Sequence, residues 1–245
     1  MDDITIFSSD TSAFNKEIAG EFEIKDIGPA DLMLGVKILR TNLLITLDQQ
    51  HFTEALLDLY GLSKCKPVST PLLPNVHMSP ATEDKIKKFK VLAVNYCSVI
   101  GSINYLRTAT RPDLSQSVSS LLQFLENPGI QHWNAFLHIL RYLKGTQDMS
   151  LVYSTNGAMG IKAYSDADRG NCQKTRRSVT DYLATFDGSL ILWKTPKKPT
   201  VSLSTAEAEY KAVCDLNSEL LWLRQWCQQC NLCKFKEPIP IYEEN

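Results

Sequence analysis

Two carboxylates stand where metal-assisted chemistry on a phosphodiester would need them. Asp166 and Asp168 follow segment 161–164, whose alternating polar and apolar residues are typical of a half-buried strand. Alternation places both aspartates on one side, where the strand meets a loop. An Asp-rich strand end is also common in ordinary turns. These residues alone leave both interpretations open.

A long amphipathic helix is expected over residues 204–230. Ser204 and Glu207 fit a capping box, in which Ser204 accepts from the Glu207 N–H and the Glu207 carboxylate returns to the N-cap. Apolar residues then recur every three or four positions, at Ala212, Val213, Leu216, Leu220, Leu223 and Cys227. Extending this stripe backwards reaches Glu209, whose buried charge would need a cation or a basic partner. A first-turn glutamate that leans into water is the alternative.

A further strand is expected over residues 238–242, and it leads into Glu243 and Glu244. If the helix is a right-handed crossover between two parallel strands, their carboxyl ends lie side by side. Asp166, Glu209 and Glu244 would then converge. Three carboxylates at one point repel one another unless divalent cations neutralise them, so this arrangement predicts a metal site.

These motifs resemble the ribonuclease H domain of copia-type LTR retrotransposon Pol polyproteins. The matching segments are Ala163-Tyr-Ser-Asp-Ala-Asp168, Arg176-Arg-Ser-Val-Thr180, Leu192-Trp-Lys194, Ser202-Leu-Ser-Thr-Ala-Glu-Ala-Glu-Tyr210 and Trp222-Leu-Arg224. Upstream, Met1-Asp2-Asp3-Ile4 resembles the catalytic turn of a reverse transcriptase palm. Further similar segments are Phe22-Glu-Ile-Lys-Asp-Ile-Gly28, Cys65-Lys-Pro-Val-Ser-Thr-Pro-Leu72, Val99-Ile-Gly-Ser-Ile-Asn-Tyr-Leu106, Thr110-Arg-Pro-Asp113 and Leu140-Arg-Tyr-Leu-Lys-Gly-Thr146. The resemblance covers nearly the whole chain in one order.

The resemblance implies a fold of α/β and α+β class with three parts. They are a remnant of the reverse transcriptase palm at 1–74, a helical connection at 75–156, and an incomplete ribonuclease H-like domain, with a mixed sheet and helices, at 157–245. In the family, carboxylates hold two Mg²⁺ ions that act on the RNA strand of an RNA–DNA hybrid. The residues that match these ligands are Asp166, Glu209 and Glu244, with Asp168 as an auxiliary ligand. Asp2 and Asp3 match two palm carboxylates.

Some residues depart from the family's pattern. Glu244 stands where the family has the shorter aspartate, so a metal held there could be misplaced. Asp181 stands at a usual glycine and would be strained if that position needs positive φ. The first palm carboxylate, the polymerase fingers and the fourth ribonuclease acid have no counterpart in the sequence. We therefore expect no polymerase activity and a catalytically dead nuclease.

Nucleic-acid binding would have to come from local basic clusters, because the formal net charge is −1. Two clusters flank the carboxylates in sequence, where a phosphate backbone would need cations: Lys174, Arg176 and Arg177, then Lys194, Lys197 and Lys198. The alternative is that these basic residues lie on solvated loops and bind nothing. A non-catalytic module that binds RNA–DNA hybrid, DNA or RNA, and a host-adopted interaction protein, stay open as alternatives.

The composition is typical of a globular chain of the cytoplasm or nucleus. The 245 residues are 44% hydrophobic. They contain no apolar run of about eighteen residues and no signal peptide, so a membrane partner is not expected. A small-molecule cofactor is not expected either. The seven cysteines are expected to be reduced. Cys227-Gln-Gln-Cys-Asn-Leu-Cys233 has zinc-like spacing, but Cys227 continues the apolar stripe and favours buried thiols. The four histidines form no ligand pattern.

The remaining periodicity predicts elements that support these candidates. A helix is expected near 11–21, strands at 34–40 and 43–47, and a helix at 53–60 closed by Gly61. Residues 67–80 contain four prolines and should form an extended strap. Helices are expected at 115–126 and 132–144, and Asn156-Gly157 should mark the start of the final α/β unit.

Overall fold

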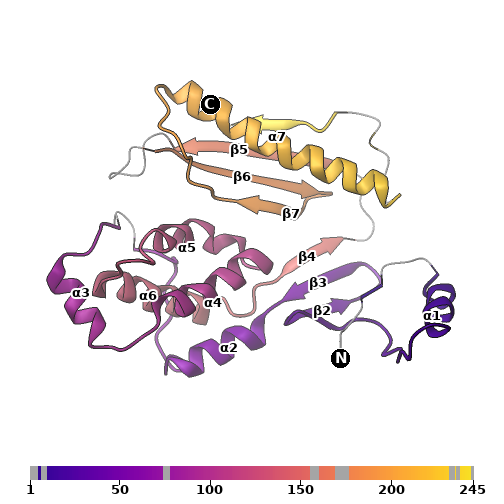
Figure 1. The fold of residues 1–245 in the computed structure, drawn as a ribbon, viewed down its shortest axis with the longest axis horizontal. Coiled ribbons are helices and arrows are strands. Elements are labelled where there is room, and N and C mark those ends of the chain that lie inside the picture. Colours follow the sequence, from indigo (N-terminus) through magenta and orange to yellow (C-terminus); the bar gives the residue numbers. More distant parts are fainter. Residues whose placement is uncertain are drawn as a thin grey trace.

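Helices and strands form two adjoining units, a sheet with one long helix and, beside it, a helical body with a smaller sheet (Figure 1). The structure is a computed structural model. It describes residues 5–6, 10–73, 78–154, 160–168, 177–231, 235 and 238–243. Mixed helices and sheets agree with the expected α/β class.

The first sheet has the strand order β1-β2-β3-β4, with antiparallel neighbours throughout. Its strands are β1 (Leu32–Met33), β2 (Val36–Arg40), β3 (Leu44–Asp48) and β4 (Leu151–Ser154). A short helix, α1 (Thr11–Ala19), precedes them and is capped by Asp10, which accepts from the Ala13 N–H at 3.0 Å. Strand β4 lies in the expected helical connection, and it pairs with β3 of the expected palm remnant. The sheet therefore spans the boundary expected at residue 74.

The helical body holds the largest hydrophobic core. It contains α2 (Gln50–Leu59), α3 (Glu83–Lys90), α4 (Tyr96–Ala109), the 3₁₀ turn η1 (Pro112–Leu114), α5 (Ser115–Leu122) and α6 (Ile130–Gly145). The helix expected at 53–60 begins earlier, at Gln50, and Gly61 follows it with a φ of +66°. Leu57 of α2 packs with Ile103 of α4 and Phe136 of α6, so α2 shares the core of residues 83–145.

A buried arginine fixes the turn between α4 and α5. Arg111 is 3% exposed, and its guanidinium forms two hydrogen bonds with the Asp113 carboxylate, at 3.0 and 2.7 Å. The same group donates to the carbonyl oxygen of Thr146 at 3.0 Å. These bonds tie η1 to the end of α6, which gives α5 a fixed position beside the second sheet.

The second sheet has the order β7-β6-β5-β8. Its elements are β5 (Ile161–Asp168), β6 (Val179–Phe186), β7 (Ser189–Lys194), the helix α7 (Thr205–Gln229) and β8 (Ile241–Glu243). Strands β5, β6 and β7 are antiparallel, whereas β8 is parallel to β5, with Glu243 opposite Ser165. The sequence left the parallel pairing of these two strands as a condition, and the structure meets it, with α7 leading from β7 to β8.

Helix α7 covers one face of this sheet, as the apolar stripe predicts. Ala212, Leu216, Leu220 and Cys227 are all buried. At the helix start the Glu207 N–H donates to Ser204 Oγ at 3.1 Å. The Glu207 carboxylate accepts from the Leu203 N–H at 2.6 Å, one residue before the N-cap that the capping box predicts.

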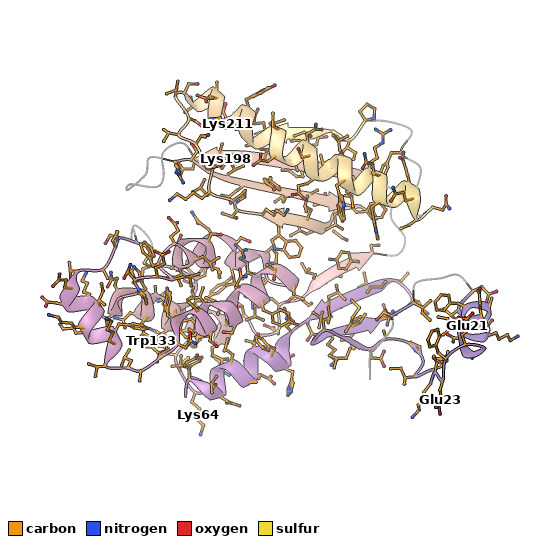
Figure 2. All side chains as sticks on the ribbon, viewed as in Figure 1. Glu21, Glu23, Lys64, Trp133, Lys198 and Lys211 are labelled. Atoms are coloured by element: carbon orange, nitrogen blue, oxygen red, sulfur yellow. The ribbon has the colours of Figure 1, made fainter. Side chains whose placement is uncertain are left out.

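The two units touch where β7 ends. The Trp193 indole N–H donates to the Arg107 carbonyl oxygen at 2.8 Å, and Ser119 Oγ donates to the Thr195 carbonyl oxygen at 3.3 Å. Figure 2 shows Trp133 within the helical body and Lys198 and Lys211 near the start of α7. The contacts of Trp193 and Ser119 hold α4 and α5 against the edge of the second sheet.

Candidate active site

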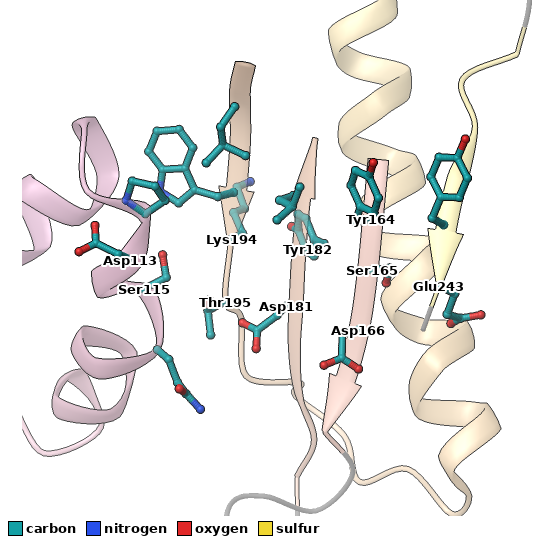
Figure 3. A pocket seen from close by; sticks show the side chains of 16 residues that line it. Asp113, Ser115, Tyr164, Ser165, Asp166, Asp181, Tyr182, Lys194, Thr195 and Glu243 are labelled. Carbon is teal, nitrogen blue, oxygen red and sulfur yellow. The ribbon is translucent and has the colours of Figure 1, made fainter. Parts of the chain in front are cut away.

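A cleft of about 780 Å³ lies between the second sheet and the η1–α5 turn (Figure 3). We call the sheet face that lines it the cleft face. In Figure 3, α7 lies behind the sheet, so the cleft face is the one that α7 leaves uncovered. The lining residues come from η1–α5 and from all four strands or the residues that follow them: Pro112, Asp113, Ser115, Gln116, Tyr164, Ser165, Asp166, Asp181, Tyr182, Leu183, Leu190, Trp193, Lys194, Thr195, Tyr242 and Glu243.

Asp166 is an exposed carboxylate near the end of β5. Burial alternates along the strand, with Ile161, Ala163 and Ser165 buried and Asp166 and Asp168 exposed. One Asp166 carboxylate oxygen accepts from the Ala167 N–H at 2.7 Å. As the alternation predicts, Asp166 and Asp168 share one side of the strand, and Asp166 lines the cleft.

Asp181 of β6 stands directly opposite Asp166. Its side chain is half-buried, and burial raises the pKa of its carboxyl above the ordinary value of 3.8. A hydrogen bond with the Thr195 side chain acts the other way, whereas the charges of Asp166 and Asp168 raise this pKa further. Asp181 lies within a regular strand and is not among the residues of positive φ, so the expected strain is absent.

Sequence reasoning noticed Asp181 only as a replaced glycine. Its place beside Asp166 depends on the β5–β6 register, which pairs residues fifteen positions apart across a long connection. No short turn sequence fixes that register. The sequence therefore carries no signal that would have placed the two carboxylates together.

Glu209 lies in the second turn of α7 and is half-buried, as the apolar stripe predicts. Helix α7 packs against the buried face of β5, whereas Asp166 lines the cleft face. Within the described part of the chain, no group of three or more His, Cys, Asp or Glu side chains could hold a metal ion. Glu244, Asp2 and Asp3 lie outside the described residues, so the convergence of Asp166, Glu209 and Glu244 stays a prediction.

The expected basic clusters are largely engaged within the fold. Lys198 is buried, and its ammonium group pairs with the Asp215 carboxylate at 2.5 Å and donates to the Lys211 carbonyl oxygen at 2.9 Å. Lys198 is only 4% exposed, so its ammonium serves the fold, and its expected phosphate contact stays a prediction. The Lys194 ammonium pairs with the Glu219 carboxylate, and Lys197 donates to Gln123 Oε1 at 3.0 Å. Arg177 is exposed, whereas Lys174 and Arg176 lie outside the described residues.

Where they are described, the histidines and cysteines agree with their structural interpretation, except at Cys230. His132 is buried, stacks on Phe124 with ring centroids 4.1 Å apart, and accepts from the Gly129 N–H at 3.0 Å. Cys227 is buried as expected, whereas Cys230 of the same motif is exposed. Cys233 lies outside the described residues, so the zinc interpretation of its motif is not tested. None of the described helices is long and apolar enough to span a membrane.

The fold and the cleft define a class of mixed α/β protein in which a carboxylate-bearing sheet is docked on a helical body. The chain is 37% identical over 95% of its length to the retrovirus-related Pol polyprotein from transposon TNT 1-94 of Nicotiana tabacum. It is 30% identical over its whole length to that from transposon RE2 of Arabidopsis thaliana. An uncharacterized mitochondrial protein of Arabidopsis thaliana is 32% identical, with 91% of each chain covered.

This chain belongs to the family of retrovirus-related Pol polyproteins of copia-type transposons. It spans 18% of the TNT 1-94 polyprotein and 17% of the RE2 polyprotein. No family model and no solved structure matches it.

Proposed function

We propose that residues 157–245 are a ribonuclease H-type unit directed at the RNA strand of RNA–DNA hybrids, and that residues 1–74 are the end of a reverse transcriptase. The observation that carries the proposal is the parallel pairing of β5 with β8 through α7. Three antiparallel strands, a helix and a strand parallel to β5 follow one another along the chain, and they form a mixed sheet such as the resemblance implies.

The strand register supports this proposal. Ser165 stands opposite Glu243, and both strands run in the same direction. The next residues in the sequence after Ser165 and Glu243 are Asp166 and Glu244. If β8 continued for one more residue in this register, the two carboxylates would be neighbours across the sheet.

The donor set suits a hard divalent cation. Carboxylate oxygens are the ligands that Mg²⁺ prefers in proteins, and Asp166, Glu209 and Glu244 would hold the ion, with Asp168 as an auxiliary ligand. When bound, Mg²⁺ supplies activation of a water and stabilisation of the leaving oxygen of a phosphodiester. The chain's own contribution is to hold the carboxylates on two strands and a helix whose relative positions are fixed by the sheet.

Three features support a weak or inactive nuclease. Asp181 brings another carboxylate next to Asp166, and two like charges on paired residues repel each other. Glu209 belongs to the helix on the covered face of the sheet, whereas Asp166 lines the open one. Glu244 is also one methylene longer than the family's aspartate. A misplacement of about 1 Å in a catalytic group can reduce a rate by about 10²-fold.

A nucleic-acid module without chemistry is less well supported. Of the cations expected to contact a phosphate backbone, Lys194 and Lys198 form ion pairs and Lys197 donates to a glutamine within the fold. A binding module would need such cations free to meet phosphates. The ribonuclease H-type unit is therefore the function we propose.

The test measures cleavage of a labelled RNA–DNA hybrid by the purified chain with Mg²⁺ or with EDTA. We expect little cleavage by the natural chain and more by the Glu244→Asp variant, with Asp166→Asn and Glu209→Gln each abolishing the gain. Asp31→Asn, a substitution at an exposed carboxylate of the first unit, is the matched control. Cleavage that Asp166→Asn leaves intact, or a Glu244→Asp variant that gains nothing and shows no effect of Mg²⁺ on its melting temperature, would contradict the proposal.

A further inference from the structure

The cleft has an aromatic floor that the proposed nuclease does not use. Tyr164 of β5 and Tyr242 of β8 stack with ring centroids 5.3 Å apart and an interplanar angle of 24°. Both rings remain open to solvent, with exposed fractions of 41% and 48%. Leu183 of β6 continues this surface on the neighbouring strand and is 36% exposed. Apolar and aromatic surface therefore runs across three strands in a row.

Carboxylates border this floor. Asp166, Asp181 and Glu243 line the cleft, and none of them forms an ion pair with a described residue. Asp113 also lines the cleft, but its carboxylate is bound by the Arg111 guanidinium.

Lys194 is the one cation among the described lining residues, and its ammonium is paired with the Glu219 carboxylate. The described lining therefore carries a net negative charge. Without a bound metal ion, this surface would repel a polyanion, whereas a cation with apolar faces would be attracted to it.

We propose that this cleft binds an arginine-bearing, otherwise apolar peptide segment of a partner protein. A guanidinium stacks on aromatic faces and forms two parallel hydrogen bonds with one carboxylate, and the cleft offers both groups side by side. Tyr164 pairs with Leu183 of β6, and Asp166, two residues further along β5 on the same side, pairs with Asp181 (Figure 3). Leu183 and Leu190 would contact the apolar residues of the segment.

The size and electrostatics of the cleft agree with such an occupant. A volume of about 780 Å³ lies within the range of about 300–1,000 Å³ that is usual for ligand sites. Asp166 and Asp181 are paired residues of neighbouring strands, so an arriving guanidinium would relieve the repulsion between two like charges. The inference shares Asp166 with the proposed metal site, but it is tested at Asp181 and Tyr164, which are not among the proposed metal ligands.

The experiment measures fluorescence anisotropy of a labelled, capped hexapeptide, Leu-Arg-Leu-Leu-Arg-Leu, titrated with the purified chain. Matched probes replace both arginines with glutamate or with lysine, and labelled oligodeoxythymidylate represents nucleic acid. We expect the arginine peptide to bind best and to weaken with salt. Removing one charged or stacking partner in the cleft should raise the Kd of the arginine peptide about tenfold, the effect of losing one charge-assisted hydrogen bond.

The variants are Asp181→Asn, which keeps the shape of the side chain, and Tyr164→Leu, which keeps an apolar group but removes the ring. Tyr210→Leu is the control, because Tyr210 is 71% exposed on α7, on the other side of the sheet. Urea denaturation checks that each variant is folded. Absence of arginine-peptide binding, equal binding of the glutamate peptide, tighter binding of the oligonucleotide, or a Kd unchanged by both cleft variants would each overturn the proposal.

Discussion

Asp166 of β5 and Asp181 of β6 are paired residues on neighbouring antiparallel strands, and both line the same cleft (Figure 3). Like charges in such a pair destabilise a sheet. Asp181 is the less exposed of the two, and its carboxyl is the one whose pKa is raised. The pair therefore stores an electrostatic cost at the place where the proposed metal ion would bind.

Replacing Asp181 with asparagine should stabilise the chain at neutral pH. The raised pKa means that the protonated form of Asp181 is favoured by folding. This favourable contribution is complete below the ordinary value of 3.8 and is lost as the pH rises through the higher folded value. At pH 7, Asp181→Asn should gain about 0.2–1 kcal/mol, the range for a cross-strand pair.

Urea denaturation of both chains over a pH series measures this difference. The gain should shrink as the pH falls through the titration of Asp181, because the natural chain also becomes neutral there. Asp31→Asn, at an exposed aspartate before β1, is the control and should show no comparable gain. An Asp181→Asn variant that is less stable than the natural chain at pH 7 would contradict this account.

The ion pair of Lys198 and Asp215 should respond unequally to removal of its two members. The Lys198 side chain is 5% exposed and that of Asp215 is 47% exposed. Asp215→Ala leaves a buried ammonium without its partner and should lower the free energy of unfolding by about 2–4 kcal/mol. Lys198→Met leaves a carboxylate that water can solvate and should lower it by about 1 kcal/mol. Chemical denaturation checks the order, and a larger loss for Lys198→Met would be inconsistent with this burial.

The N-cap of α7 should contribute measurably to stability. Ser204 Oγ accepts from the Glu207 N–H, which would otherwise lack a partner within the helix. Ser204→Ala should lower the free energy of unfolding by about 1 kcal/mol. Ser218→Ala is the matched control, because Ser218 is exposed in the middle of the same helix and bonds to the Cys214 carbonyl oxygen. Equal losses for both serines would show that the cap is not formed in solution.

Local periodicity was enough to predict most of the elements, because each depends on neighbouring residues. The apolar stripe of α7 and the Ser204 cap are examples, and both are present. The parallel pair β5–β8 was considered as a condition for the carboxylates to converge, and the structure contains it. In contrast, β4 has four residues, and its partner β3 is about a hundred residues earlier in the chain. No local pattern specifies a pairing of that separation.

The candidate site was predictable only in part for the same reason. Alternation placed Asp166 on the exposed side of β5, and the stripe placed Glu209 at a half-buried position. The sequence also suggested that Lys198 belongs to a basic surface patch, but charge in a sequence does not report burial. Lys198 packs beneath α7 because Asp215, seventeen positions later, supplies its counter-charge. Burial of this kind is decided by tertiary packing.

The central claim, that Asp166, Glu209 and Glu244 form one metal site, can be measured by NMR with Mn²⁺ as a paramagnetic substitute for Mg²⁺. Amide signals close to the bound ion broaden at low Mn²⁺ concentration. The account predicts that the amide signals around all three residues broaden, that excess Mg²⁺ reverses the broadening, and that the broadening is lost in the Asp166→Asn variant. Broadening that is confined to other carboxylates, or that persists unchanged in Asp166→Asn, would contradict it.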